Sequence, residues 1–371
     1  MKILLTGLGI LTAGAVPALA GGIERTPQAL GVLFEKGNYV ELTFGGVDPD
    51  ISGRDFTAYG GSDTGEVGHG FGLSGIAYKH DFTDKLSGAF IMERPYGADI
   101  RYDAFPGGSL MLGGTEALVD STRYTAILRY KFDDSLSFHA GIRGSYADGE
   151  VSLGGLAYGP VSGYHVDLDD TWWFGWLAGV AYEIPELAAR ISLTYNSPIE
   201  HDFDTNETLG GAPLGPESET TVRTPRSWVV EGQTGVSPTT LVFASIRWVN
   251  WSEFRVDPDV FVALTGSGLV EFEDTTTYTI GVGHKFTDAW SGAASISYEP
   301  DGDDDVSPLA PTNGQVGITL AAIYTRDRMK VTTAINYTKL GDAYPAPGGN
   351  RVAEMSDNHA WGAGVKIGYS F

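Results

Sequence analysis

The 371-residue sequence predicts an all-β protein, a transmembrane antiparallel β-barrel of 14 strands. Three features of the chain lead to this fold class. It begins with an export signal, after which no apolar run is long enough for a membrane helix. Its side chains alternate between apolar and polar with a period of two. The alternating segments are joined by connections that are short and long in turn, which is typical of outer-membrane barrels.

The first 20 residues have the pattern of a secretory signal peptide. Lys2 is followed by the apolar stretch Ile3–Val16 and then by Ala18–Ala20, which fits cleavage after Ala20. The apolar stretch is shorter than the roughly 20 residues that a membrane-spanning helix needs. We therefore expect an exported protein that is either soluble or a β-barrel.

The alternation is clearest at the C-terminus. One parity consists of Trp361, Ala363, Val365, Ile367, Tyr369 and Phe371, whereas the other holds glycines, Lys366 and Ser370. Such strands suit a wall with lipid on one side and an enclosed lumen on the other. Aromatic residues cluster near the expected strand ends, as in 172–176 and 248–251, where they would meet lipid headgroups. The terminal Phe371 is a feature familiar in barrels handled by the outer-membrane assembly machinery, so we expect that machinery and the outer-membrane lipids as partners.

The connections support an even number of strands, which brings both chain ends to the periplasm. A soluble sandwich or jelly roll would also alternate, but its strands are usually shorter than the segments expected here. Six short and seven long connections join the 14 strands: the short ones lie around 81–85, 133–135, 184–186, 235–239, 287–289 and 325–328, and the long ones around 47–67, 98–115, 152–165, 204–220, 255–270, 301–314 and 341–358.

Composition excludes several classes of function. The formal charge of −23 repels nucleic acid, and the absence of cysteine removes disulfides and thiol chemistry. None of the seven histidines stands in a metal-ligand spacing or beside a nucleophile motif, so we expect no catalytic residues, no cofactor and no metal site. The acidic run 301–305 is interpreted as a solvated loop rather than a calcium site. The protein is therefore not expected to be an enzyme.

Several blocks of sequence carry a family resemblance. The most specific runs from Trp173 to Glu183 and continues through 193–197 and 201–203; others are 146–151, 251–254, 95–97 and 360–371. From Asn38 onward the chain resembles the long-chain fatty acid transporters of the outer membrane, the FadL and TodX type. The chain departs from the family pattern at 21–37, which is short and lacks an Asn-Pro-Ala-type motif, and at Asp148 and Glu150, where many relatives carry basic residues.

The resemblance implies a barrel of residues 38–371 whose lumen is closed by a short N-terminal plug, residues 21–37. It also implies a greasy capture groove among the external loops, an internal apolar pocket, and a kink in the third strand that opens a passage through the wall. The implied function is passive transport of hydrophobic small molecules across the outer membrane of a Gram-negative bacterium. Long-chain fatty acids are the leading substrates, and hydrocarbons come next.

Two sets of candidate site residues belong to this interpretation. Two long connections are greasier than water-facing loops usually are, which suggests ligand capture by Phe105, Leu110, Met111, Leu112, Phe261 and Leu264, although the same loops could instead cap the barrel. In the third strand, Pro95 removes a backbone donor and Gly97 permits a bend, so Pro95, Tyr96 and Gly97 are the candidate lateral opening. The alternative is that these residues only end the strand at the membrane surface.

The predicted lumen wall mixes charged and greasy positions. Arg123, Arg129, Arg143 and Arg247 share their parity with small polar residues, and Phe243 and Val249 lie among them. Arg143 or Arg255 could bind a substrate carboxylate, although an inward arginine more often pairs with a neighbouring acid. A general porin for small polar solutes is the second hypothesis; it would need rings of charge across a constriction, whereas this mixture fits narrow greasy patches in a polar wall. A structural or adhesive barrel without transport is the third.

Overall fold

The computed structural model describes residues 22–26, 28 and 30–371, so the predicted signal peptide lies outside the described residues. Throughout these described ranges, no helix has both the length and the apolar character required to span a membrane. The helical segments are short: η1 (Gly31–Phe34), η2 (Thr57–Tyr59), η3 (Leu156–Val161), η4 (Pro185–Leu187), η5 (Trp251–Glu253), η6 (Pro347–Gly349) and α1 (Asp259–Thr265).

The wall of the molecule is one antiparallel sheet that closes on itself, because β1 pairs with β22 along the full length of β1. Three of the 14 barrel strands are broken into two parts: β4 (Leu86–Glu93) with β5 (Gly97–Arg101), β9 (Ala189–Asn196) with β10 (Ile199–Leu209), and β12 (Ser218–Thr224) with β13 (Ser227–Ser237). The unbroken strands are β1 (Tyr39–Asp50), β3 (Phe71–Asp81), β6 (Glu116–Lys131), β7 (Leu136–Leu153), β8 (Tyr164–Ile184), β14 (Thr240–Val249), β15 (Thr275–Lys285), β16 (Trp290–Glu299), β18 (Asn313–Arg326), β19 (Met329–Gly341) and β22 (His359–Ser370). The predicted 14-stranded barrel is confirmed.

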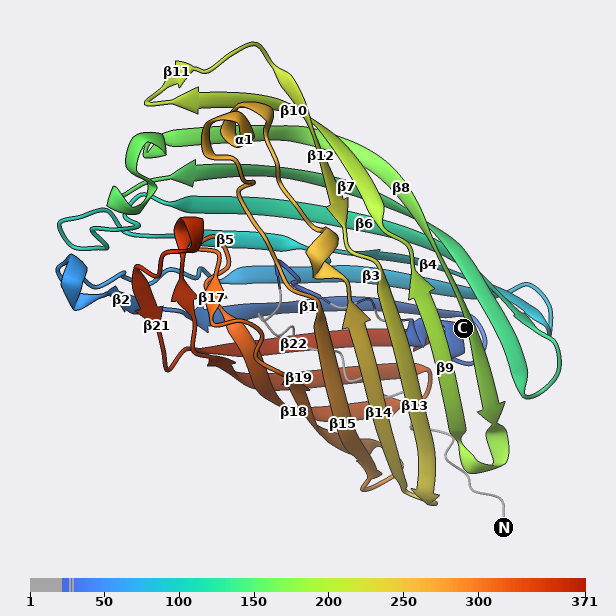
Figure 1. Ribbon diagram of the computed structural model, residues 1–371. Coiled ribbons are helices and arrows are strands. Elements are labelled where there is room, and N and C mark those ends of the chain that lie inside the picture. The colour runs from blue at the N-terminus through green and yellow to red at the C-terminus, as the bar shows by residue number, and fades with distance from the viewer. Residues whose placement is uncertain (1–21, 27, 29) are drawn as a thin grey trace.

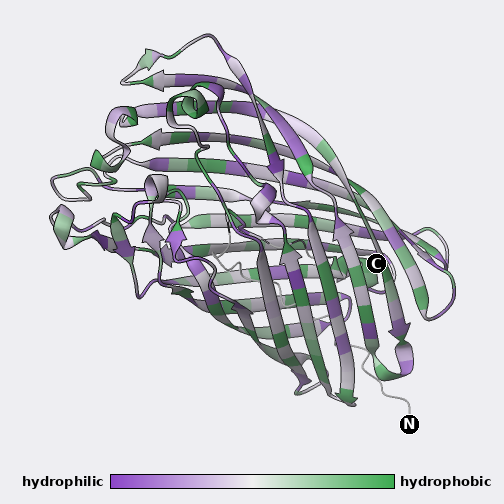
Figure 2. Ribbon diagram, viewed as in Figure 1, coloured by the Kyte–Doolittle hydropathy of each residue, from purple (hydrophilic) through white to green (hydrophobic). Residues whose placement is uncertain are grey.

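The barrel is greasy outside and polar inside. Leu128, Ile142 and Ile280 point outward and are 55%, 65% and 66% exposed, whereas Thr125 and Arg129 point inward and are buried. Figure 2 shows the resulting bands of hydrophobic and hydrophilic residues along the strands. Soluble proteins rarely expose an apolar surface of this extent to water. The outward face of the barrel therefore requires a surrounding apolar phase.

Aromatic rings form belts near both ends of the outward faces. Their contacts fix the rings against one another within and between strands, as expected where amphipathic rings meet headgroups. One belt includes the ring pairs Tyr124–Trp172, Tyr146–Trp172, Trp176–Tyr195, Tyr195–Trp228 and Tyr337–Trp361, and the other includes Tyr78–Phe371, Tyr130–Phe132 and Trp290–Tyr324.

The two ends of the barrel differ (Figure 1). The long connections, with α1 and the small strands β2 (Gly53–Asp55), β11 (Ala212–Pro213), β17 (Asp305–Val306), β20 (Tyr344–Pro345) and β21 (Ala353–Met355), gather at one end, and the short turns lie at the other with the C-terminus. Loops distant in sequence pair with each other there, as β2 with β21 and β17 with β20. The external loops therefore form a folded layer over the barrel mouth.

Inside the lumen, in the half that lies toward the short turns, the N-terminal segment packs against the wall. Leu30, Val32 and Leu33 are buried among inward side chains of the first strands, including Ala77 and Ile91. The Phe34 ring lies between the guanidinium groups of Arg129 and Arg190, at 4.4 and 3.9 Å from their Cζ atoms. An ion pair between the side chains of Glu35 and Lys330 links the segment to the wall at a further point. These contacts tie η1 to strands on several sides of the barrel.

Candidate functional site

The third barrel strand is broken between β4 and β5, and the break leaves a gap in the wall on the side of β3. Pairing between β3 and β4 ends at Ile76 and Met92, and the next contact on that side is the bridge between Gly68 and Ile100. On the other side, β5 pairs with β6 from Gly97 onward. Pro95 lies between the two halves, and proline cannot donate to a sheet ladder. The three residues Pro95, Tyr96 and Gly97 thus stand at the break.

The N-terminal segment fills this gap as a short added strand. The backbone N–H groups of Arg25 and Thr26 donate to the Pro95 carbonyl at 2.8 and 3.2 Å, and the Gly97 N–H donates to the Ile23 carbonyl at 2.9 Å. Glu24 and Tyr96 form the corresponding antiparallel bridge. The backbone groups freed by the break are in this way satisfied by residues some 70 positions earlier in the chain, as buried backbone groups must be.

Alternate residues of this added strand point to opposite sides of the wall. Glu24 points into the lumen, where its carboxylate accepts two hydrogen bonds from Arg247 at 2.5 and 2.6 Å. Arg25 points through the gap, and its Nη1 lies 3.3 Å from Oδ1 of Asp120, which stands on the outward face of β6. Arg94 binds the same carboxylate. One outward aspartate therefore holds both the added strand and the end of β4.

Two hollows meet at Arg25. The inner one, about 50 Å³, is lined mainly by apolar groups that include Ile23, Ile51 and Phe71. The outer one is open and much larger, about 670 Å³. Arg25, Ala98 and Asp99 line both hollows, and of these only Arg25 is positively charged. The Arg25 guanidinium thus separates a greasy interior space from the outside of the barrel.

The outer hollow is strongly acidic. It is lined by Asp99, Asp120, Asp148, Glu150, Asp167, Asp169 and Asp170, with Arg25 and Arg101 as its cations. Arg101 is already paired with Asp99 and Glu116 at 3.0 and 3.1 Å. Tyr146 of the aromatic belt lies at the edge of the hollow, which places the hollow on the external side of the lipid-facing band.

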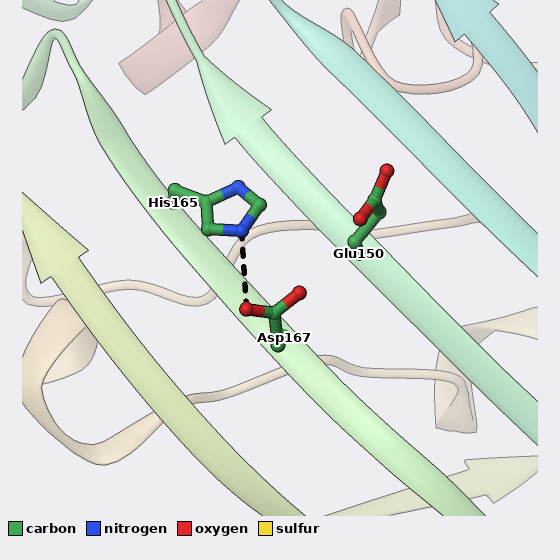
Figure 3. A group of neighbouring side chains, drawn as sticks. All are labelled: Glu150, His165 and Asp167. Atoms are coloured by element: carbon green, nitrogen blue, oxygen red, sulfur yellow. Dashed lines mark ion pairs between the residues drawn. The ribbon is translucent and has the colours of Figure 1, made fainter. Parts of the chain in front are cut away.

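Three possible metal ligands meet in this region. Ligand atoms of Glu150 on β7 and of His165 and Asp167 on β8 lie within 4.8 Å of one another, and His165 Nε2 is 3.2 Å from Asp167 Oδ2 (Figure 3). The other ring nitrogen of His165 is 2.9 Å from the Ser152 hydroxyl. These half-buried side chains offer the oxygen and nitrogen ligands that a divalent cation binds. Sequence spacing gives no sign of this group because the strand register brings it together.

The external half of the lumen is greasy. A buried cluster includes Tyr96, Leu168, Phe203, Trp251 and Phe261, contributed by the inward faces of several strands and by the connection that holds η5 and α1. Rings pack edge to face, as in Tyr96 and Trp251 with centroids 5.9 Å apart. The cluster leads from the external mouth to Tyr96 at the break.

Glu207 fixes the position of α1 at the external mouth of the lumen. Its carboxylate accepts hydrogen bonds from the backbone N–H groups of Val260 and Phe261 at 2.9 and 2.7 Å, and from the Tyr164 hydroxyl at 2.8 Å. An acid that binds the free N–H groups of a first helical turn also complements the helix dipole. The helix therefore presents Phe261 to the lumen, 4.8 Å from the Tyr164 ring.

The six predicted capture residues do not form one surface. Phe261 is buried in the lumen cluster, while Met111 and Leu112 are buried in a second cluster among the loops. Leu110 is half-buried, and Phe105 and Leu264 are exposed. The two clusters touch through Ile100 and Tyr158, which pack against both. The loops do fold over one another, and two of the six side chains, Phe105 and Leu264, are exposed.

The two arginines proposed as carboxylate partners differ in their surroundings. Arg143 is buried on the inward face of β7, donates to the Ser197 carbonyl at the break between β9 and β10, and has no partner for its Nε atom among the described residues. Arg255 lies in an external connection, half-exposed, and pairs with Glu271 at 2.8 Å. Of these two arginines, only Arg143 has a buried donor without a partner among the described residues.

Sequence reasoning missed Arg25, Asp120 and the other two breaks. Each further break contains a proline, Pro198 or Pro225, and a proline inside a predicted strand could have shown it. The pairing of Arg25 with Asp120 joins residues 95 positions apart and leaves no local signal.

Comparison with known proteins agrees with this architecture. A family model described as outer membrane protein transport protein (OMPP1/FadL/TodX) matches residues 5–371. A long-chain fatty acid transport protein of Escherichia coli O6:H1 is 21% identical over 375 aligned residues, which cover 89% of this chain and 80% of that protein. The crystal structure of a Pseudomonas aeruginosa FadL homologue superposes with a TM-score of 0.74 at 17% identity and covers 92% of each chain. That of the toluene transporter TodX of P. putida gives 0.66 at 16% identity and covers 91% of each chain.

The structural likenesses concern the fold, since their sequence identities are low. The family model, in contrast, spans almost the entire sequence, including the broken third strand and the C-terminal strand that closes the barrel. The chain therefore belongs to the OMPP1/FadL/TodX family of outer-membrane transport proteins of Gram-negative bacteria, which carry hydrophobic substrates.

Proposed function

We propose that this protein is a passive channel that admits hydrophobic small molecules, long-chain fatty acids foremost, and releases them through the break in its third strand. The greasy cluster between the external mouth and Tyr96 supports this route, because an apolar chain is stabilised wherever it leaves water. In this proposal the exposed Phe105 and Leu264 make the first contact with the solute. No energy source is needed, since the solute moves down its own gradient.

The observation that supports fatty acids as the substrate is the buried side chain of Arg143. A buried guanidinium with an unused donor is costly unless an anion reaches it. A carboxylate can accept that hydrogen bond, and charge-assisted hydrogen bonds are the stronger kind. We infer that Arg143 binds the head of the fatty acid while its chain lies in the greasy cluster. An uncharged hydrocarbon would leave this donor unsatisfied.

The N-terminal segment serves as the plug in this scheme. Its two ends are held differently: Phe34 and Glu35 are bound to Arg129, Arg190 and Lys330, whereas residues 23–26 are bound to the break. We propose that the second end moves and the first stays in place. The passage toward the third strand then opens while the periplasmic half of the lumen remains closed to ions.

The test is uptake of labelled oleate and toluene by cells in which this protein replaces the resident fatty acid channel. In Arg143→Gln, oleate uptake should fall on the order of tenfold, as expected for loss of a charged hydrogen bond, while toluene uptake stays the same. Arg223→Gln is the matched control, because Arg223 pairs with Glu200 on the exposed surface. Oleate uptake equal to that of cells without the protein would refute fatty acid transport, and a large steady conductance in planar bilayers would favour a general porin.

Uncharged hydrocarbons are the second candidate, and the acidic outer hollow favours them. A carboxylate that emerges there meets seven acidic side chains, whereas toluene does not feel their charge. Saturable toluene uptake that excess oleate does not inhibit would support this candidate over fatty acids.

A further inference from the structure

We infer that Arg25 determines which solutes cross the break: its ion pair with Asp120 is a latch that a solute carboxylate can release and an uncharged solute cannot. The inference rests on the proposed function and adds a specificity-determining residue to it. It follows from the position of one buried cation between two compartments of opposite character.

Arg25 stands between the inner and the outer hollow. The inner hollow, about 50 Å³, has room for only a few water molecules, so an acyl chain cannot pass unless the added strand moves. The Arg25 guanidinium stands over the Phe71 ring, 4.7 Å from its centroid, and reaches Asp120 on the far side of the wall. Movement of the added strand must therefore break the latch.

The two partners of the latch are unequal. The Arg25 side chain is only 9% exposed and has Asp120 as its one acidic partner among the described residues, whereas the Asp120 side chain is 43% exposed and also binds Arg94. When the latch opens, Asp120 keeps Arg94 and water, but Arg25 loses its ion pair and retains only the weaker attraction of Asp99. A buried cation without a partner is costly, so the barrier to opening lies mainly with Arg25.

A carboxylate removes that barrier, because it can replace Asp120 before the latch is fully open. The Nε atom of Arg25 is buried and has no hydrogen-bond partner among the described residues, so a donor is available for an arriving carboxylate. An uncharged solute of the same shape offers no such exchange. The same guanidinium then accompanies the carboxylate past the acidic outer hollow, which would otherwise repel it.

The added strand is attached to the barrel by a second ion pair, which Glu24 forms. It anchors the neighbouring residue to Arg247 on β14, so the added strand can lose Arg25 and still return to the break. The latch therefore selects among solutes, and the Glu24–Arg247 pair keeps the segment in place.

The experiment compares a fluorescent long-chain fatty acid with its methyl ester, which has the same chain and no charge, in proteoliposomes that contain the full chain. The wild-type protein should transport the acid about fivefold faster than the ester, the upper range for a partly exposed ion pair. Arg25→Gln should bring the ratio near one, chiefly by raising ester transport, and Arg25→Lys should keep most of the preference. Arg223→Gln should leave the ratio unchanged.

A ratio that is unaltered in Arg25→Gln would overturn the inference, whereas transport of neither solute by the wild-type protein would refute the proposed function instead. A second measurement does not depend on folding of the arginine variants. The chain contains no cysteine, and Glu24 and Tyr96 are antiparallel bridge partners, so Glu24→Cys with Tyr96→Cys can form a disulfide. Oxidation should stop transport of both solutes and reduction should restore it. Transport that ignores the disulfide would show that solutes cross without movement of the added strand, which would overturn both the proposed opening and the inference.

Discussion

A methyl group on Gly97 would lie 2.3 Å from Cζ of Arg25. Two nonbonded carbon atoms cannot lie so close together, so the path of Arg25 through the wall depends on the missing side chain of Gly97. Gly97 is opposite Asp120 in the register of β5 and β6, which places the open space directly beside the anchor of the guanidinium.

Gly97→Val should therefore displace Arg25 and separate it from Asp120. We expect transport of an uncharged hydrophobic ester to rise by up to about fivefold, the factor that an ion pair of about 1 kcal/mol represents. Gly72→Val is the control, because a side chain at Gly72 would meet nothing within 4 Å. Ester transport that is equal in both variants would show that the path of Arg25 does not limit release.

The Pro95–Gly97 segment could be singled out from the sequence because proline and glycine act on the backbone locally. The segment that occupies the break could not be identified from the sequence. The occupant comes from residues 23–26, and its hold depends on Asp120, which alternation alone marks as an acid on the lipid-facing parity of β6. Long-range ion pairs of this kind follow from strand register, which a single sequence does not reveal.

Phe34 should be the main anchor of the plug. Two cation–π contacts of about 0.5–2 kcal/mol each hold its ring between Arg129 and Arg190. In Phe34→Ala we expect η1 to loosen, with faster hydrogen exchange over residues 30–36 and a higher ion conductance in planar bilayers. Phe286→Ala, which removes an exposed ring near a short turn, should change neither quantity. Wild-type conductance in Phe34→Ala would mean that the lumen is closed by other groups.

The barrel itself was predictable because alternation is a physical requirement of its wall. Every second residue of the last strand from Trp361 to Phe371 points outward on the predicted parity. The six short and seven long connections separate the strands as predicted, although β5 and β10 extend into the connections expected at 98–115 and 204–220. The packing of the external loops against one another could not be predicted from the sequence. Met111 and Leu112 look like ligand-capture residues by their greasiness, yet they are buried in contacts with distant loops such as that of Met355.

Asp274 should make the external connection between η5 and β15 sensitive to acid. Burial alone would raise the pKa of its carboxyl, but hydrogen bonds from the Ser252 backbone and from the Ser252 and Asn250 side chains outweigh burial and lower that pKa. A pKa that is lower in the folded state stabilises the fold above the unfolded value, about 3.9, and this stabilisation is lost as the pH falls through the folded pKa.

We therefore expect limited proteolysis of residues 250–274 to speed up as the pH falls below about 4. In Asp274→Asn the cleavage rate should be higher at neutral pH and should depend less on acid. Glu271→Gln, an exposed residue of the same connection, is the control. A cleavage rate with the same acid dependence in Asp274→Asn and the wild-type protein would contradict this assignment.

Ile142 should report most directly on the surroundings of the wall. It lies on the outward face of β7, 65% exposed and next to the inward Arg143. If its side chain meets hydrocarbon, Ile142→Arg should lower the free energy of unfolding in liposomes by about 2–4 kcal/mol, the cost of a basic side chain at the bilayer midplane. Ile142→Leu should change it by less than about 1.5 kcal/mol, because volume is conserved. Denaturant titrations of the two variants measure the difference, and equal stabilities would mean that this face meets water, since an arginine in water carries no such cost.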